Sequence, residues 1–147
     1  MSRKKNEIRF DVYYKYDELI GVVRALVEEY PKLAELKCIG ESYEGRKIWL
    51  VEITNNSTGP ALEKPAFWMD GNIHAGEVTA SMANLKFIWH LLTKYCEDPY
   101  VTELLDERVI YVVPRTNPDG AELYLTSPYT LRSSVRPFPY SDRKSVV

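Results

Sequence analysis

Groups that bind metals or act as nucleophiles are scarce in this sequence of 147 residues, which holds only two cysteines and two histidines. Cys38 and Cys96 lie far apart and match no metal-binding spacing, so we expect free structural thiols, with a disulfide between them as the alternative. Any site that needs an imidazole must use His74 or His90. This scarcity restricts the metal sites that the chain can form.

The sequence also lacks a long apolar run and an excess of charge of either sign. Without a run of about 18 apolar residues, it offers no candidate for a membrane span. The 19 lysines and arginines nearly balance 21 aspartates and glutamates, which argues against a nucleic acid partner. The basic residues at the N-terminus are not followed by the apolar core of a secretory signal, so the cytoplasm is the expected compartment. With 45% hydrophobic residues, the composition suits one globular domain.

Local patterns predict alternating strands and helices. The periodicity of apolar residues predicts helices over residues 16–30, 77–95 and 99–106. Short apolar segments predict strands over residues 36–41, 47–54, 66–70 and 109–113, with a turn at 43–46 between the first two. We expect the 66–70 strand to be buried, the 109–113 strand to be central, and Asn117-Pro118-Asp119-Gly120 to form a turn. This order predicts an α/β fold, with a mixed parallel and antiparallel sheet flanked by helices.

One short segment, between the 66–70 strand and the next helix, combines residue types that bind zinc. His74 and Glu77 form an H-x-x-E pair, in which an imidazole and a carboxylate can converge on one ion. Gly71 and Gly76 would allow the chain to bend tightly there. Functional groups of α/β sheets commonly lie in loops at the carboxyl ends of parallel strands, which favours a metal site at this position. The alternative is a His and a Glu that only cap the start of the helix.

Two other zinc-protease patterns are absent from the sequence. No Glu follows His74 directly, and Val78 stands where an H-x-x-E-H motif would need a second His. His90 lies roughly 20 Å beyond Glu77 along the predicted helix, so we expect it to be a packed or surface side chain. The pair therefore supplies two of the three protein ligands that a catalytic zinc needs.

Three segments, taken in order, resemble the zinc carboxypeptidases of the carboxypeptidase A type. They are Gly45-Arg46-x-Ile48 in the predicted hairpin, Phe67-x-x-Asp70-Gly71-Asn72-Ile73-His74-Ala75-Gly76-Glu77, and Pro114-Arg115-Thr116-Asn117-Pro118-Asp119-Gly120. The resemblance covers roughly residues 10–140. It implies the mixed α/β fold of that family and a zinc-dependent metallocarboxypeptidase, which hydrolyses the C-terminal bond of a peptide or protein substrate with a zinc-activated water.

The resemblance also implies roles for four residues. His74 and Glu77 would bind Zn²⁺. An arginine about a dozen residues beyond the Asn-Pro-Asp-Gly segment would polarise the scissile carbonyl and stabilise the oxyanion, which requires a fixed cation where negative charge develops. Arg132 stands at that spacing and is our preferred catalytic and substrate-binding arginine. Arg136 is the competing candidate for binding the substrate.

Several other parts of the family's site find no match before Val147. These are the second zinc histidine, the Asn-Arg pair that binds the substrate carboxylate, a tyrosine and the general-base glutamate. We therefore interpret residues 1–141 as the N-terminal portion, about half, of a zinc carboxypeptidase domain. Residues 142–147, Asp-Arg-Lys-Ser-Val-Val, correspond to the translation of a common sequencing adapter, GATCGGAAGAGCGTCGTG, and are interpreted as a non-native tail. The alternative is an ordinary polar tail.

Three consequences are expected from an incomplete domain. The chain should bind zinc weakly at most and should not turn over substrate. Its sheet should have an unpaired edge and an exposed hydrophobic flank, at either the 109–113 or the 66–70 strand.

The alternatives to a carboxypeptidase are a non-catalytic domain of the same fold that serves as an interaction or structural module, and an enzyme that hydrolyses a small amide at the same zinc site.

Overall fold

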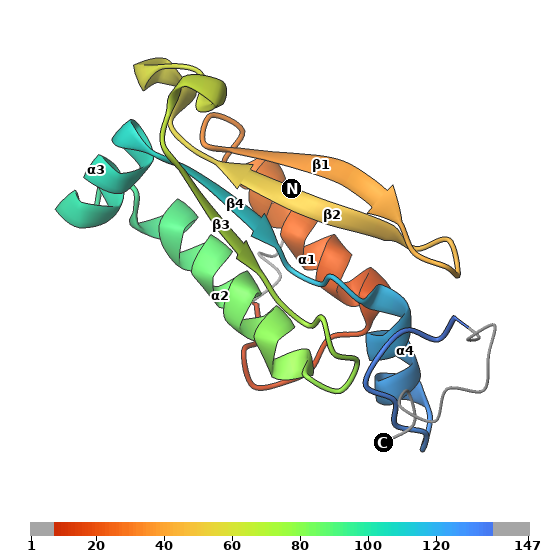
Figure 1. Cartoon of the computed structure of the whole chain (residues 1–147). Helices are drawn as coiled ribbons and strands as arrows, with labels where there is room; N and C mark the ends of the chain where they lie inside the picture. The colour runs from red at the N-terminus through yellow and green to blue at the C-terminus, as the bar shows by residue number, and fades with distance from the viewer. Residues whose placement is uncertain (1–7, 137–147) are drawn as a thin grey trace.

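The computed structural model describes residues 8–136 and contains a four-stranded sheet, four α-helices and two short 3-10 helices. The helices are α1 (Tyr16–Glu29), α2 (Val78–Lys94), α3 (Pro99–Glu107) and α4 (Pro118–Thr126). The strands are β1 (Ala34–Glu41), β2 (Lys47–Ile53), β3 (Ala66–Asp70) and β4 (Val109–Val113). The 3-10 helices η1 (Asn56–Thr58) and η2 (Ala61–Glu63) connect β2 to β3 (Figure 1).

The sheet is mixed, as the sequence predicts. Its strand order is β1-β2-β4-β3, with β4 in the interior between an antiparallel neighbour, β2, and a parallel one, β3. β1 and β2 form the predicted hairpin, whose turn is closed by a hydrogen bond from the Ser42 N–H to the Arg46 carbonyl. Gly45 takes a φ of +79° in this turn, a left-handed conformation that costs glycine little.

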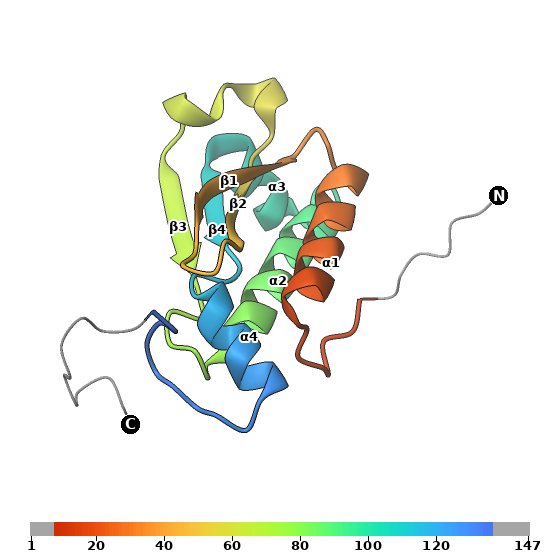
Figure 2. The same ribbon diagram turned by 90° about the vertical axis from the view of Figure 1, so that its right-hand side faces the viewer.

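Helices α1 and α2 cover one face of the sheet, and the core lies between them and the strands (Figure 2). The fully buried side chains between these helices and the sheet include Leu19, Val23, Val51, Ile53, Leu85, Ile88, Ile110 and Val112. Burying one such side chain stabilises the fold by roughly 1.5–3 kcal/mol. No described helix covers the opposite face of the sheet, so the two-layer arrangement has one open side.

The predicted turn at residues 117–120 is wrong, because these residues begin α4. The Asn117 side chain caps the helix by accepting a hydrogen bond from the Gly120 N–H at 3.0 Å, and Pro118 is the first helical residue. Asn, Pro and Asp favour tight turns and helix N-termini for the same reasons, namely side-chain capping and a preset φ. The apolar residues of α4 beyond Gly120 decide between the two by packing.

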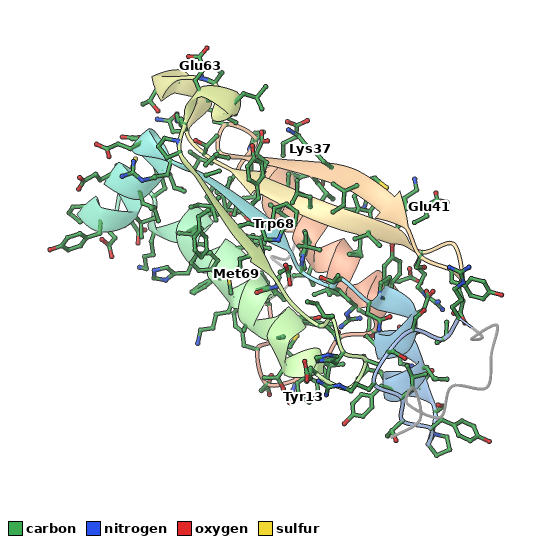
Figure 3. The ribbon with its side chains drawn as sticks, viewed as in Figure 1. Tyr13, Lys37, Glu41, Glu63, Trp68 and Met69 are labelled. Carbon is green, nitrogen blue, oxygen red and sulfur yellow. The ribbon has the colours of Figure 1, made fainter. Side chains whose placement is uncertain are left out.

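The prediction that the 66–70 strand is buried is also wrong. β3 is one of the two edge strands, and Phe67 and Trp68 are each about half exposed. Figure 3 shows Trp68 on this strand. β4 is interior and its residues are largely buried, as predicted for a central strand. Of the two candidate sites for an exposed hydrophobic flank, the structure therefore selects residues 66–70.

Among residues 8–136, neither cysteine and neither histidine belongs to a group of three side chains that could hold a metal. Cys38 and Cys96 are free and exposed, and His90 is an exposed residue of α2. Within residues 8–136, no helix is long and apolar enough to cross a bilayer. The metal-binding candidates in the described part of the chain are therefore those at the start of α2.

Candidate metal centre

The segment that carries His74 lies against the segment that follows β4. The parallel pairing of β3 with β4 continues beyond both strands, because the Thr116 N–H donates to the Gly71 carbonyl at 2.9 Å and the Asn117 N–H donates to the Asn72 carbonyl at 3.1 Å. This places the two loops at the same end of the sheet, as expected for the carboxyl ends of parallel strands.

His74 and Glu77 point toward each other. The Nδ1 atom of His74 lies 2.9 Å from both Oε1 and Oε2 of Glu77. The two residues are held in one turn by a hydrogen bond from the Glu77 N–H to the His74 carbonyl at 3.1 Å, and α2 begins at the next residue. The side chains are 37% and 55% exposed, so both are accessible from solvent. The geometry thus brings an imidazole nitrogen and a carboxylate to a single accessible point.

Arg132 reaches the same point, although it is 55 positions further along the chain than Glu77. Its Nη1 lies 3.8 Å from Oε1 of Glu77, and its carbonyl accepts a hydrogen bond from the Ala75 N–H at 2.9 Å. Arg136 has no contact with His74 or Glu77 among the interactions of residues 8–136; its N–H donates to the Ser134 hydroxyl. The structure therefore brings one of the two candidate arginines beside the pair.

The pair fits a zinc ion as two ligands of a larger set. Imidazole nitrogen and carboxylate oxygen are both common zinc donors, and here they share one focus. Within the part of the chain that the structure describes, no group of three His, Cys, Asp or Glu side chains could hold a metal. A catalytic zinc at this point would require one more protein ligand.

Asn72 is a residue of this loop that the sequence analysis assigned no role. It has a φ of 60°, in the left-handed region, and only 2% of its surface is exposed. Its Nδ2 donates to the carbonyls of His74, at 2.7 Å, and Ala75, at 3.2 Å. Apart from glycine, Asn is among the residues that best tolerate this backbone conformation. The Gly-Asn pair directly after a strand was therefore the sequence signal that could have indicated a structural role for Asn72.

Gly71 serves a purpose other than the tight bend predicted for it. The left-handed residue of the loop is Asn72, and neither Gly71 nor Gly76 has a positive φ. A Cβ at Gly71 would lie 2.7 Å from Nδ2 of Asn84 and 3.1 Å from the Ala80 carbonyl oxygen. The glycine is required because the loop passes very close to α2.

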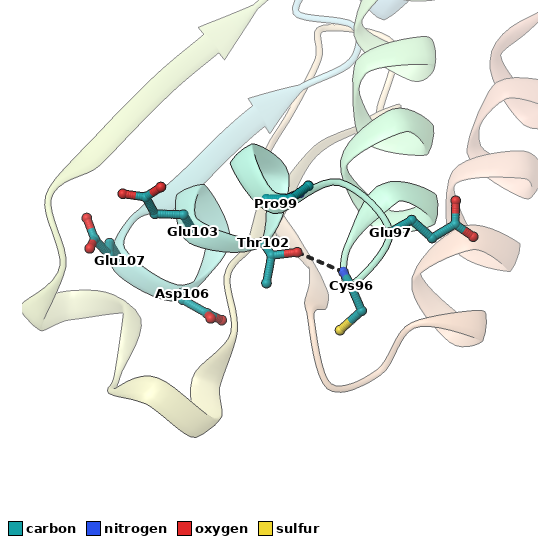
Figure 4. Close-up of a pocket in the computed structure, with 7 residues that line it drawn as sticks. All are labelled: Cys96, Glu97, Pro99, Thr102, Glu103, Asp106 and Glu107. Atoms are coloured by element: carbon teal, nitrogen blue, oxygen red, sulfur yellow. Dashed lines mark hydrogen bonds between the residues drawn. The ribbon is translucent and has the colours of Figure 1, made fainter.

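A separate hollow of about 600 Å³ lies at the other end of α2, around Cys96 and α3 (Figure 4). Its walls include four carboxylates, those of Glu97, Glu103, Asp106 and Glu107. The Cys96 N–H donates to the Thr102 hydroxyl at 2.9 Å, which closes the turn between the helices. None of the residues placed beside His74 contributes to this hollow.

Comparison with known proteins gives a consistent result. The family described as "Zinc carboxypeptidase" matches residues 19–141 of this chain. Carboxypeptidase A1 from Bos taurus is 34% identical over 119 residues, which cover 81% of this chain and 27% of that protein. Carboxypeptidase D from Rattus norvegicus is 34% identical over 122 residues, or 83% of this chain and 9% of that protein. The crystal structure of carboxypeptidase A from Helicoverpa armigera matches 97% of this chain and 33% of its own with a TM-score of 0.79; its 24% identity shows the fold alone.

This chain belongs to the zinc carboxypeptidase family, whose members are metallocarboxypeptidases that act on peptides. The resemblance inferred from the three sequence segments is confirmed, and so is the expected mixed α/β fold. The chain spans about a quarter of the length of bovine carboxypeptidase A1 and a third of the Helicoverpa structure. Zinc is the metal that the family name implies.

Proposed function

We propose that the protein of which this chain forms part is a zinc metallocarboxypeptidase that hydrolyses the C-terminal bond of a peptide or protein. The single observation that supports it is the approach of His74 Nδ1 to both carboxylate oxygens of Glu77 at 2.9 Å, in a chain of this family. The capping alternative has less support, because Glu77 stands at the N-cap of α2 but its side chain makes no capping hydrogen bond.

His74 and Glu77 would hold the zinc ion through an imidazole nitrogen and a carboxylate. When bound, zinc lowers the pKa of a water molecule and polarises a carbonyl group. Arg132 would keep its guanidinium at this point, where it can donate hydrogen bonds to the carbonyl oxygen of the substrate and stabilise the negative charge that develops there. The hydrogen bond from the Ala75 N–H to the Arg132 carbonyl would fix the distance of Arg132 from the metal-binding loop.

The substrate would be the C-terminus of a peptide or protein, with Arg132 and, as a second candidate, Arg136 contacting it. The 147-residue chain itself should not turn over such a substrate, because the described residues contain neither a third metal ligand nor a second carboxylate beside the pair. Purified chain supplied with zinc should therefore give no hydrolysis of a hippuryl-amino-acid substrate. Robust hydrolysis would show that these residues suffice and would contradict this expectation.

Zinc titration of the full chain tests the proposed metal site. His74→Ala and Glu77→Gln should each weaken zinc binding about tenfold or more, the scale of a lost ligand or its close partner. His90→Ala is the matched control, because it removes the only other imidazole and should leave binding unchanged. Calorimetry measures the affinity, and the imidazole NMR signals show which histidine responds. Binding that is indifferent to His74, or no binding, would contradict the proposal.

The same titration bears on the non-catalytic alternative. An interaction module that keeps only the fold would not need an imidazole and a carboxylate at one accessible point, so the alternative has less support. The non-catalytic alternative would be favoured if neither His74→Ala nor Glu77→Gln changed the zinc affinity. The rest of the reading frame would then be expected to lack the family's second zinc histidine.

A further inference from the structure

Arg115 is a deeply buried cation directly behind the metal-binding loop. Only 3% of its surface is exposed, and among residues 8–136 no carboxylate lies within 4 Å of its guanidinium. Desolvation lowers the pKa of Arg115 to about 10, so the side chain remains protonated at neutral pH. The attraction of the Glu122 carboxylate opposes this lowering of the pKa, and the hydrogen bonds of Arg115 supply the rest of what holds this costly buried charge in place.

A continuous chain of hydrogen bonds leads from Arg115 to the loop of His74. The Arg115 Nε donates to the Ser81 hydroxyl at 3.1 Å, and Ser81 donates to Oδ1 of Asn72 at 3.0 Å. Asn72 Nδ2 then donates to the carbonyls of His74 and Ala75. Ser81 and Asn72 are both buried, so water does not compete for these bonds. The guanidinium is anchored on its other side, where Nη2 donates to the Tyr14 carbonyl at 2.9 Å.

The chemistry of the donors gives this chain a direction. A guanidinium can only donate, so the Ser81 hydroxyl must accept from Arg115 and can use its single proton only toward Asn72. Asn72 then presents its oxygen to Ser81 and its amide N–H groups to the two loop carbonyls. With the opposite amide orientation, its nitrogen would face the Ser81 proton and its oxygen would face two carbonyl oxygens. The cation and the two loop carbonyls therefore favour the same amide orientation, in which Asn72 holds the loop in a backbone conformation that it adopts only at some cost.

We propose that Arg115 is a positioning residue for the metal site: acting through Ser81 and Asn72, it holds the loop backbone so that His74 faces Glu77. The proposal rests on the zinc role proposed above for these two residues. Arg115 itself touches neither the pair nor a substrate. Its effect is on the fraction of molecules in which the imidazole is aimed at the carboxylate.

Metal affinity of the full chain, measured in four variants, tests the proposal. Arg115→Met and Ser81→Ala should each weaken zinc binding about tenfold, as expected for groups that orient a ligand. Both substitutions interrupt the same path, so their effects should not add. The double variant should bind zinc about as tightly as whichever single variant binds it less tightly. Ser81→Ala removes one oxygen atom and keeps the test decisive if Arg115→Met does not fold.

Thr54→Val is the control for general loosening. Thr54 is equally buried and its hydroxyl donates to the Arg108 carbonyl at 2.8 Å, at the end of the sheet away from His74. It should lower the free energy of unfolding while leaving the zinc affinity unchanged. Equal weakening by Thr54→Val would overturn the positioning role, and so would wild-type affinity in Arg115→Met and Ser81→Ala.

Zinc binding by the wild-type chain separates the positioning role of Arg115 from the proposed metal site at His74 and Glu77. If wild-type binding is lost in His74→Ala but unchanged in Arg115→Met and Ser81→Ala, only the role of Arg115 fails. If wild-type chain shows no zinc binding that depends on His74, the proposed metal site fails and the positioning role is overturned with it. Local amide exchange supplies an independent readout: Arg115→Met should speed exchange of the Ala75 N–H and leave β2 unaffected.

Discussion

Close packing at single residues decides the shape of the metal-binding loop. Gly71 lies where the end of β3 passes under α2, and a methyl group there would meet Asn84 and Ala80. Asn84 is itself committed, because its Nδ2 donates to the Val113 carbonyl at 3.0 Å. Neither neighbour can retreat without breaking a contact of β4 or of the α2 backbone.

Gly71→Ala is therefore expected to lower the free energy of unfolding by about 1–3 kcal/mol, the cost of forcing an extra carbon into a packed site. Gly21→Ala is the matched control on α1, where an added Cβ meets nothing within 4 Å. It should raise the free energy of unfolding by about 0.5–1 kcal/mol through reduced backbone freedom in the unfolded chain. Urea denaturation at neutral pH measures both changes. Equal stabilities of the two variants would contradict the steric argument.

At the residue scale, contacts between residues close in sequence could be predicted, whereas contacts between residues from different segments could not. The H-x-x-E spacing predicts that His74 and Glu77 can converge, because the pair needs only one turn of backbone. Arg115, Ser81 and Asn72 come from three segments, and no spacing in the sequence indicates that they form one path. Arg132 was found through the family resemblance, and its approach to Glu77 was visible only in the fold.

At the scale of the element, α4 is tied to the distant β1–β2 hairpin by one buried carboxylate. Asp119, in the first turn of α4, accepts hydrogen bonds from the Ser42 hydroxyl at 2.7 Å, the Glu44 N–H at 2.9 Å and the Arg46 guanidinium at 2.7 Å. Burial alone would raise the pKa of Asp119, but the Glu44 N–H, Arg46 and Ser42 together hold it below its usual value. The hairpin tip is thereby fixed to the helix that follows β4.

The lowered pKa of Asp119 makes this link sensitive to pH. The stabilisation is fully present above the pKa of the unfolded chain, about 4, and is lost as the pH falls through the lower pKa of the folded state. Asp119→Asn should lower the free energy of unfolding at pH 7 by about 1.5–3 kcal/mol, and the difference from wild type should narrow below about pH 4. Urea unfolding at a series of pH values measures this. A difference that stays constant down to pH 3 would show that the carboxylate charge is not responsible.

Local patterns predicted most elements because each has an autonomous signal. The apolar periodicity of residues 16–30 and 77–95 corresponds to α1 and α2, and the strand segments are found within two residues of their predicted limits. The largest difference is in β1, which begins at Ala34. Residues 117–120 were mistaken for a turn since their side chains suit both a turn and a helix start. Only the packing of α4, with Gly120 so near Ala75 that a Cβ would lie 2.7 Å from it, resolves the ambiguity.

On the scale of the whole molecule, the sheet is left open at β3. This strand pairs with β4 on one side only, and Trp68, 52% exposed, packs at a tilt against Tyr111 on the uncovered face, with ring centroids 6.3 Å apart. An edge strand with exposed aromatic side chains is a template for pairing with another chain. Self-association through β3 is the expected consequence for the isolated chain.

Trp68→Lys should reduce this self-association, because a charge on the open edge opposes pairing and removes an apolar contact. Leu62→Lys is the control: Leu62 is 94% exposed but lies in η2, outside the strand. Light scattering over a range of concentrations should show a lower association in the first variant and little change in the second. Equal effects would indicate that total exposed apolar surface, rather than the strand edge, drives association.

The sequence by itself determined the kinds of element, their order and the local pair His74 and Glu77, because helix and strand periodicity and a three-residue spacing act over short stretches of backbone. The sequence also contains three motifs that together indicate the family. The tertiary structure alone decided which strands lie at the edges of the sheet, which arginine reaches the pair and how Arg115 connects to the loop. Those depend on contacts between segments tens of residues apart, where packing and buried hydrogen bonds select one arrangement among many that the local pattern permits.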